Sequence, residues 1–296
     1  MKHGRSYGTS SEEGLRKIIF TANLRHIQSE NANPENTYRL AANKFADFSQ
    51  AEFSKIYLGL KPKDKPTRNL TSTLENETLP LSVDRRTKGA VTPVKDQGQC
   101  GSCCTFSTTG SLEGGWFQKS GKLQAMSEQQ LVDCDRKSDE GCNGGEMEDA
   151  FNYIKQKGIE VESTYPYKGV DKVCKYSKGK TIQGLKVAGY TTVRAKSENA
   201  LKAAIAKTTV AVSIDANKIM LYDSGFFNNK KCGHDLDHGV LGVGYGPEKG
   251  NDYWLIKNSW NEDWGEKGYI WFVRHDGTGK MGICGITEDN IYPNLS

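Results

Sequence analysis

The chain has 296 residues, of which 36% are hydrophobic and 26% are charged, a composition typical of a folded domain with a sizeable core. Its 40 Lys and Arg against 36 Asp and Glu leave a net charge of +4, which is too balanced to indicate nucleic-acid binding. No apolar stretch reaches the roughly 18 residues that a transmembrane helix needs, so a membrane span is excluded.

The eight cysteines bear on the cellular compartment. They suit a secreted enzyme with a few disulfides, and a cytosolic zinc protein is the competing interpretation. The N-terminus, Met1 to Arg5, lacks the apolar segment of a signal peptide. We therefore expect either a truncated precursor or cysteines that stay reduced.

The N-terminal part of the chain predicts two helices followed by a linker. The first helix spans 11–31, with Ser10 or Ser11 as its cap and acidic residues in its first turn. The second spans about 51–57. Residues 61–79 are rich in Pro, Thr and Asn and poor in apolar residues, which is typical of a linker. The segment before this linker is therefore a separable unit.

The rest of the chain changes from a helical to an alternating pattern. Helices are expected at 103–119, 127–133 and 145–157. From about residue 181, apolar and polar residues alternate between Gly-rich turns, which predicts an antiparallel sheet or barrel. The expected strands are 208–215, 238–245, 253–257 and 268–274. This order predicts an α+β fold of two packed lobes, with a functional site in the cleft between them.

The motif Cys100-Gly-Ser-Cys103 is the first that carries chemistry. A Cys-x-x-Cys pair is typical of a zinc half-site or a redox pair, but neither a second ligand pair nor a βαβ context accompanies it. Cys103 also opens a predicted helix, and the unpaired N–H groups of a helix start favour a thiolate. A nucleophilic cysteine is therefore a third interpretation. It requires a general base and a group that orients the base.

Two of the five histidines can provide that base. His234 and His238 are four residues apart, as in a metal-binding helix, but flanking glycines and the alternation of 240–245 indicate a strand instead. His238, at the start of this strand, is the better candidate. Asn258 is followed by two tryptophans, which suggests a dry amide that orients the imidazole ring.

These residues belong to a longer series of motifs. His238 and Asn258 stand 135 and 155 residues after Cys103. The other motifs are Gln97-Gly-Gln-Cys100, Cys142-Asn-Gly-Gly145, Asp237-His238-Gly-Val240, Lys257-Asn-Ser-Trp260 and Trp264-Gly-Glu-Lys-Gly-Tyr269. In this order and spacing the chain resembles a papain-family cysteine protease precursor of the cathepsin L-like group.

The N-terminal part resembles the inhibitory propeptide of that family in two patterns. They are Glu12, Arg16, Phe20, Asn23, Ile27 and Asn31, and then Ala41, Asn43, Phe45 and Asp47, with Ala in place of the usual Gly. The resemblance implies an N-terminally truncated, mainly helical propeptide at 1–60, a linker with the maturation site at 61–79 and a protease domain at 80–296. It also implies that the propeptide runs backwards through the cleft and blocks it until cleavage near Leu79 or Pro80.

The resemblance implies an endopeptidase with a papain-like fold, in which a helical left lobe faces an antiparallel, β-barrel-like right lobe. Cys103 is the expected nucleophile, as a thiolate paired with protonated His238, and it forms a thioester acyl-enzyme. The side chain of Gln97 and the N–H of Cys103 form the expected oxyanion hole. Asn258 is expected to hold the His238 ring under Trp260. No metal or other cofactor is expected.

Three disulfides are also implied, and they leave Cys103 and Cys104 free. The pairs are Cys100–Cys142, Cys134–Cys174 and Cys232–Cys284. From the sequence alone, eight cysteines allow many other pairings.

The resemblance further implies where a substrate binds. The expected substrate-binding residues are Gly144, Gly145, Met147, Ser213, Leu236, Trp260 and Asp289. An extended peptide is expected along the two glycines, where main chain can approach main chain. Asp289 stands at the base of the S2 pocket, where this group usually has a small residue. The pocket is therefore expected to accept Arg as well as Leu or Phe, unless Asp289 turns to solvent.

Two positions depart from the family pattern. Cys104 follows the nucleophile where Trp is usual, and Arg85 also stands where the pattern has Trp. A buried Arg85 would add an unpaired charge. A second function therefore stays open, namely a catalytically impaired homologue that acts as a protease inhibitor or decoy.

The expected partners follow from the resemblance. They are protein and peptide substrates, the chain's own propeptide in the cleft and cystatin-like inhibitors. We expect a monomer that binds no nucleic acid. Its expected location is lysosomal or extracellular.

Overall fold

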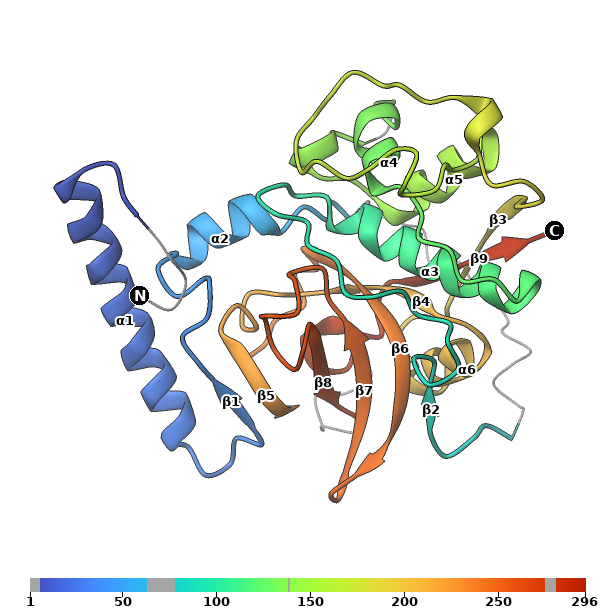
Figure 1. Cartoon of the computed structure of the whole chain (residues 1–296). Coiled ribbons are helices and arrows are strands. Elements are labelled where there is room, and N and C mark those ends of the chain that lie inside the picture. Colours follow the sequence, from blue (N-terminus) through green and yellow to red (C-terminus); the bar gives the residue numbers. More distant parts are fainter. Residues whose placement is uncertain (1–5, 63–77, 138, 275–280) are drawn as a thin grey trace.

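The computed structural model describes residues 6–62, 78–137, 139–274 and 281–296. Helices α4 and α5 gather on one side of the molecule and most of the strands on the other, with α3 between them and α1 at the outer side (Figure 1). The helices are α1 (Ser10–Ala32), α2 (Gln50–Tyr57), α3 (Cys103–Ser120), α4 (Glu128–Cys134), α5 (Met147–Lys157) and α6 (Glu198–Lys207). The expected two-lobed α+β architecture is confirmed.

The strands form one continuous sheet. They are β1 (Tyr38–Leu40), β2 (Val83–Asp84), β3 (Val187–Thr192), β4 (Val210–Ile214), β5 (Tyr222–Phe227), β6 (His238–Glu248), β7 (Asn251–Lys257), β8 (Tyr269–Val273) and β9 (Asn290–Leu295). Their order is β1-β5-β8-β7-β6-β4-β9-β3, with β2 paired to β6. Neighbouring strands run antiparallel except β5 and β8, so the predicted antiparallel sheet is wrong for that one pair.

Several elements were not predicted. Besides β1, β2, β3, β5 and β9, the structure contains α6 within the region whose alternation predicted strands only. The local sequence explains this helix, because the Ser197 side chain caps it by accepting from the Ala200 N–H, and Ala is frequent within it. The prediction of strands alone from residue 181 onward is therefore wrong at α6.

Helix α1 begins one residue before the predicted range. Its cap is Thr9, whose hydroxyl oxygen accepts from the Glu12 N–H at 3.1 Å, so the predicted caps Ser10 and Ser11 are wrong. Both serines are exposed within the first helical turn. Helix α2 starts with a reciprocal capping box between Ser49 and Glu52.

The propeptide-like pattern of α1 has a structural cause. Arg16 donates to the Asp47 carbonyl at 3.0 Å and pairs with Glu52 at 2.9 Å. Asn23 donates to the carbonyls of Ala46 and Phe48, and Asn31 bonds both the N–H and the carbonyl of Leu40. These side chains lie along one face of α1 and fix the path of the segment that follows it.

Helix α3 lies between the two lobes, and small residues allow the sheet to approach it. A Cβ atom at Gly114 would lie 2.1 Å from the Thr209 hydroxyl oxygen, and one at Gly110 would lie 2.8 Å from a Leu241 methyl carbon. The first twelve residues of α3, Cys103–Gly114, are buried. The N-terminus of this helix is therefore held rigidly at the boundary between the lobes.

Arg85 is partly buried, but its charge has partners. Its Nε donates to the Ile205 carbonyl at 3.0 Å, and a terminal nitrogen donates to the Ala206 carbonyl. Both carbonyls belong to the last turn of α6, where a cation is favoured by the helix dipole. The expected unpaired charge at Arg85 is therefore wrong.

Three disulfides join the pairs Cys100–Cys142, Cys134–Cys174 and Cys232–Cys284. These are the pairs that the family resemblance implies. Cys103 and Cys104 are free and buried. Among the described residues, no helix has both the length and the apolarity to cross a membrane.

Candidate active site

Cys103 is the first residue of α3 and is fully buried. The segment 97–102 leads into this helix start and is pinned by the Cys100–Cys142 disulfide and by the Gly101 N–H, which donates to the Cys142 carbonyl at 2.8 Å. Ser102 precedes the helix without making a side-chain cap bond. The thiol therefore lies at a helix N-terminus whose approach is covalently fixed.

The first residue of β6, His238, lies beside the end of β7. The His238 Nε2 lies 2.8 Å from the Asn258 Oδ1, which also accepts from the Ser259 N–H at 2.8 Å. Because that amide oxygen only accepts, Nε2 carries a hydrogen and Nδ1 of a neutral ring keeps its lone pair. Nδ1 has no hydrogen-bond partner among the described residues. It is the atom available for proton transfer.

The imidazole ring is covered by aromatic side chains. It stacks on Trp260, with ring centroids 4.7 Å apart and planes at 27°. Trp264 packs edge-on against Trp260 at 4.9 Å. His238, Asn258 and both tryptophans are buried, so the amide that orients the ring is shielded from water, as the sequence predicts.

Gln97 has both ends of its side-chain amide fixed. Its Oε1 accepts from the Ser259 hydroxyl at 2.7 Å. Its Nε2 donates to the carbonyls of Cys100 and Tyr57, at 2.9 Å each. Since Tyr57 ends helix α2 in the N-terminal segment, this amide already holds a peptide carbonyl that comes from another part of the chain.

The N-terminal segment continues from Tyr57 through the cleft as an extended chain. Leu60 forms a parallel bridge with Gly145, in which the Gly145 N–H donates to the Gly59 carbonyl at 2.9 Å and the Lys61 N–H donates to the Gly145 carbonyl at 3.2 Å. The Leu60 N–H also donates to the Asp237 carbonyl at 3.0 Å. Of the two glycines predicted to hold a peptide, Gly145 makes these bonds directly.

Glycines permit this close approach. A Cβ atom at Gly144 would lie 2.0 Å from the Gly59 carbonyl oxygen, and one at Gly59 would lie 1.7 Å from the Gly101 carbonyl oxygen. Gly59 was not predicted as a functional residue. The only signal in the sequence was a glycine between the second predicted helix and the linker.

Burial opposes the charged forms of both Cys103 and His238 in this closed state. It raises the pKa of the Cys103 thiol, while main-chain N–H groups of Gly239 and Gly59 act in the opposite direction. Burial also lowers the pKa of His238 to about 4, against the bond to Asn258. With the N-terminal segment in the cleft, the neutral thiol and neutral ring are thus favoured over the predicted ion pair.

The residues predicted for the S2 pocket are brought together in two groups. Met147 and Leu236 belong to one apolar cluster, which also contains Leu60 of the N-terminal segment. The Ser213 hydroxyl donates to Asp289 Oδ2 at 2.9 Å, and both residues are buried. The alternative in which Asp289 turns to solvent is therefore wrong.

Cys104, the residue after Cys103, is also buried. It packs in the same apolar cluster as Cys103 and Met147. Burial is the main cause that raises the pKa of its thiol well above the usual range, and the nearby charge of Asp139 raises this pKa further. The thiol therefore stays neutral and acts as a small core residue.

Residues outside the predicted set also shape the site. The His234 Nδ1 lies 3.1 Å from the Glu288 Oε1, and His234 precedes the strand that His238 begins. The two histidines are not part of any metal-binding group among the described residues. Ser259 fixes Gln97, and Tyr167 contacts both Gln97 and Ser102. No local pattern indicated these contacts, because the partners lie 162, 70 and 65 positions apart.

Comparison with known proteins agrees with this geometry. The family described as papain family cysteine protease matches residues 79–294, and the one described as cathepsin propeptide inhibitor domain matches residues 1–53. The chain belongs to the papain family of cysteine proteases. It carries the propeptide of a zymogen at its N-terminus, and that propeptide is the segment that occupies the cleft.

Individual members of the papain family match almost the whole chain. Digestive cysteine proteinase 1 of Homarus americanus is 44% identical over 306 residues, which cover 99% of this chain and 92% of that protein. Cathepsin L1 of Drosophila melanogaster is 43% identical over 312 residues, covering 99% and 82%. The structure of digestive procathepsin L 3 of Tenebrio molitor superposes with a TM-score of 0.89 at 39% identity, covering 99% and 96%.

These comparisons establish the activity. The chain is the zymogen of a cysteine-type endopeptidase of the cathepsin L-like group. Nothing in them supports the alternative of an impaired homologue that acts as an inhibitor or decoy.

Proposed function

We propose that Cys103, His238, Asn258 and Gln97 perform the hydrolysis in the roles predicted from the sequence. The observation that carries this proposal is the position of the Tyr57 carbonyl, which accepts from the Gln97 Nε2 in the cleft at 2.9 Å. A donor that binds a peptide carbonyl beside a thiol at a helix start has the arrangement of an oxyanion hole. Gln97 would donate in the same way to a substrate carbonyl once the propeptide has left.

The proposed reaction begins with the ionisation of Cys103 and His238. Loss of the propeptide rehydrates the cleft and removes the burial that favours the neutral groups, so a Cys103 thiolate and a His238 imidazolium can form. The sulfur bonds to the substrate carbonyl carbon, and the carbonyl electron pair moves to the oxygen that Gln97 and the Cys103 N–H bind. His238 Nδ1 then gives its proton to the leaving nitrogen as the C–N bond breaks.

The second half of the reaction returns the enzyme to its starting state. His238 takes a proton from water, the resulting hydroxide attacks the thioester carbon, and the C–S bond breaks to release the carboxylic acid product and Cys103. Asn258 would keep Nδ1 aimed at these protons, because its bond to Nε2 fixes the ring while Trp260 limits its tilt.

An experiment with the two adjacent free cysteines tests this assignment. After acid activation of the full chain, Cys103→Ala should lose peptide turnover by more than about 10⁴-fold and remain uncleaved. Cys104→Ala is the matched control and should keep both turnover and labelling by an electrophilic thiol probe. Thiol-dependent turnover that survives in Cys103→Ala would refute the role of Cys103.

We also propose that Asp289 makes the S2 pocket accept Arg besides Leu and Phe. The support is that Asp289 is buried and accepts from the Ser213 hydroxyl, while Met147 and Leu236, the apolar residues predicted for this pocket, pack in one cluster. Asp289→Ala should lower kcat/KM about tenfold for a peptide with Arg at this subsite and leave a Leu peptide unchanged. Equal loss for both peptides would show that the carboxylate does not select for Arg at this subsite.

Maturation is proposed to divide the chain into the propeptide 1–60, the linker 61–79 and the protease domain 80–296. The chain joins the protease fold at Pro80, whose carbonyl accepts from the Tyr245 hydroxyl at 3.1 Å. Leu81 next to it is 74% exposed, so a protease can reach this point. Cleavage near Leu79 or Pro80 would leave β2 in place in the sheet.

The remaining partners are proposals of the same kind. Protein and peptide substrates would bind along Gly144 and Gly145, with Trp260 beside the leaving group, and cystatin-like inhibitors would compete for the same cleft. Three disulfides favour an oxidising, lysosomal or extracellular location. A monomer suffices for the reaction, because one chain supplies every residue of the site.

A further inference from the structure

Tyr167 lies on a loop that touches the segment leading into α3. Its ring packs edge-to-face on Phe106, with centroids 4.9 Å apart, and Phe106 belongs to the first turn of α3. Burial raises the pKa of its hydroxyl above the usual range, so the hydroxyl keeps its proton. A protonated phenol can donate one hydrogen bond and accept others.

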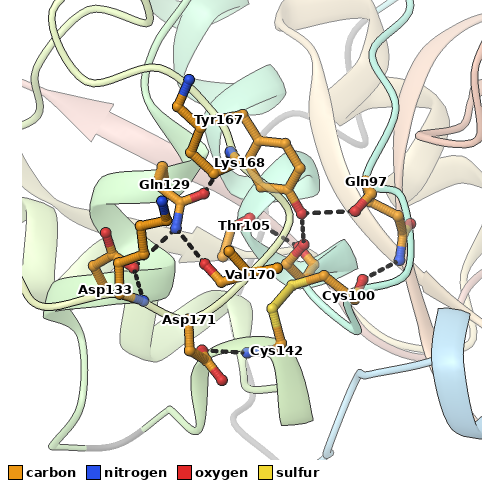
Figure 2. Close-up of a disulfide and its surroundings, with 12 residues drawn as sticks. Gln97, Cys100, Thr105, Gln129, Asp133, Cys142, Tyr167, Lys168, Val170 and Asp171 are labelled. Atoms are coloured by element: carbon orange, nitrogen blue, oxygen red, sulfur yellow. Dashed lines mark hydrogen bonds between the residues drawn. A yellow bond between two sulfur atoms is a disulfide. The ribbon is translucent and has the colours of Figure 1, made fainter.

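The direction of both bonds at this hydroxyl is determined by its partners. The Tyr167 hydroxyl donates to the Gln97 main-chain carbonyl at 2.8 Å, because a carbonyl oxygen can only accept (Figure 2). The hydroxyl has no second hydrogen, so the Ser102 hydroxyl donates to it at 2.7 Å. One phenol oxygen therefore bridges Gln97 and Ser102.

Each of these two residues is linked covalently to one of the two proposed oxyanion donors. Gln97 supplies its side-chain amide, and Ser102 forms the peptide whose N–H belongs to Cys103. The direction of that peptide is fixed separately, since the Ser102 carbonyl accepts from the Thr105 N–H at 2.9 Å and from the Thr105 hydroxyl at 2.8 Å. The distance between the two donors also depends on how far the main chain at Gln97 lies from Ser102, and Tyr167 joins these two residues.

The segment between the two donors does not set this distance alone. It contains Gly98, with a positive φ of 59°, and Gly101, so its main chain has wide conformational freedom. The disulfide holds Cys100, the Gly101 N–H is bonded to the Cys142 carbonyl, and the Gln97 amide donates to the Cys100 carbonyl. The Tyr167 hydroxyl adds the bridge that joins Gln97 at one end of the segment to Ser102 at the other.

The loop that carries Tyr167 is itself anchored. The Lys168 N–H donates to Gln129 Oε1 at 2.7 Å, and the Gln129 Nε2 donates to the Val170 carbonyl at 2.8 Å. Asp171 Oδ1 accepts from the Cys142 N–H at 2.9 Å, on the other side of the disulfide (Figure 2). The residues that follow Tyr167 therefore fix its loop to α4 and to Cys142.

We propose that Tyr167 is a positioning residue that sets the spacing of the two oxyanion donors for hydrolysis. This inference rests on the proposed roles of Gln97 and the Cys103 N–H. Charge develops on the substrate oxygen only in the transition state, so a wrong spacing lowers kcat and kcat/KM and leaves KM unchanged. Among the described residues, the Tyr167 hydroxyl bonds to Gln97 and Ser102 and not to Cys103 or His238, so we expect the alkylation profile of the thiol to stay the same.

The test uses the full chain after acid activation and removes single hydroxyls from one loop. Tyr167→Phe keeps the ring on Phe106 and should lower kcat about tenfold, short of the roughly 10²–10³-fold cost of losing a donor, with KM unchanged. Tyr165→Phe is the matched control, because that hydroxyl is bonded to Asp133 and the Lys175 N–H and should leave kcat unchanged. The pH profile of thiol alkylation by iodoacetamide should coincide in all variants, since alkylation needs no oxyanion.

Gln97→Ala separates failure of this inference from failure of the proposed site. If Gln97→Ala keeps full turnover, the oxyanion assignment itself is wrong. If Gln97→Ala loses turnover but Tyr167→Phe does not, the positioning role of Tyr167 is wrong. A loss shared by Tyr165→Phe, or a shifted alkylation profile in Tyr167→Phe, shows a general structural effect and also overturns the proposal.

A second route covers the case in which Tyr167→Phe does not fold. Ser102→Ala removes the other end of the bridge and should lower kcat several-fold by the same mechanism. Where Tyr167→Phe does fold, the two losses should not multiply in the double variant, because each single change already breaks the one bridge. Full activity of Ser102→Ala, or fully multiplicative losses, would contradict a shared bridge.

Discussion

The propeptide meets the protease through two regions of opposite character. The first, here called the anchor, consists of Phe45 and Phe53, whose rings pack edge-on against Trp260 at 5.6 and 5.1 Å. The second, here called the strap, is the extended segment 57–61, which crosses the cleft by main-chain hydrogen bonds to Gln97, Asp237 and Gly145. The anchor covers Trp260, which stacks on His238, and the strap covers Cys103.

The anchor and the strap contribute differently to binding the propeptide and to blocking the cleft. Both anchor rings are fully buried, and burying a Phe side chain is worth about 1.5–3 kcal/mol. Each hydrogen bond of the strap contributes only about 0.5–1.5 kcal/mol net, because the open chain would bond to water instead. The strap adds the burial of Leu60 against Met147 to these bonds, so both regions contribute affinity, while only the strap crosses the cleft and occludes it.

The largest effect is expected from breaking the anchor. Phe53→Ala should cost about 3–5 kcal/mol of docking and raise the fraction of open cleft by about 10²–10⁴-fold. We would measure this as the initial rate at which an electrophilic thiol probe labels Cys103 in the uncleaved chain at neutral pH. Phe20→Ala is the control, because that ring is 38% exposed on α1. An unchanged labelling rate in Phe53→Ala would show that the anchor does not hold the propeptide.

A smaller effect is expected from breaking the strap alone. In Gly59→Ala the new methyl carbon would lie 1.7 Å from the Gly101 carbonyl, so the strap must lift while the anchor stays docked. Labelling of Cys103 should accelerate about tenfold to a hundredfold, in line with the loss of about two or three main-chain bonds. Gly14→Ala, which places a methyl group on α1 in open space, should not change the rate. If Gly59→Ala labels as slowly as the parent chain, the strap does not close on Gly101.

The same contrast explains what the sequence could reveal. The anchor and the catalytic groups are side chains in motifs, so Phe45, Cys103 and His238 could be identified from residue types and order. The strap bonds through its main chain, and a main-chain bond leaves almost no trace in residue identity. Its only sequence mark is Gly59, which alone also fits an ordinary turn.

A missed element also produced a wrong expectation elsewhere. The charge of a buried Arg85 was expected to be unpaired. Its partners are the carbonyls of Ile205 and Ala206 at the end of α6. That helix was not predicted, so its unsatisfied carbonyls could not be foreseen. Tyr167 was missed for a related reason: a bridge between residues 65 and 70 positions apart requires the tertiary structure.

The smallest effect concerns the ion pair that holds α1 to α2 and so supports the anchor. The pKa of Glu52 is lowered from 4.5 to about 2, first by the Ser49 N–H and then by Arg16. Because the folded pKa lies below the unfolded one, the stabilisation is complete above about pH 4.5 and disappears as the pH falls through about 2. The pair therefore persists at the mildly acidic pH used for activation, and loosening of the propeptide there must come from other groups.

Glu52→Gln tests this by amide hydrogen exchange of α2 between pH 2 and 7. The variant should open more easily by about 0.5–1 kcal/mol at every pH above 5, a modest value because the side chains are 19% and 34% exposed. The difference from the parent chain should shrink as the pH falls below about 4.5 and be nearly gone at pH 2, where Glu52 is protonated in the unfolded parent and about half protonated in the folded one. Glu35→Gln, at an exposed glutamate after α1, should show no difference at any pH. Convergence already at pH 5 would mean that this ion pair is itself the element released by mild acid, and that the anchor opens from its α1 side rather than at Trp260.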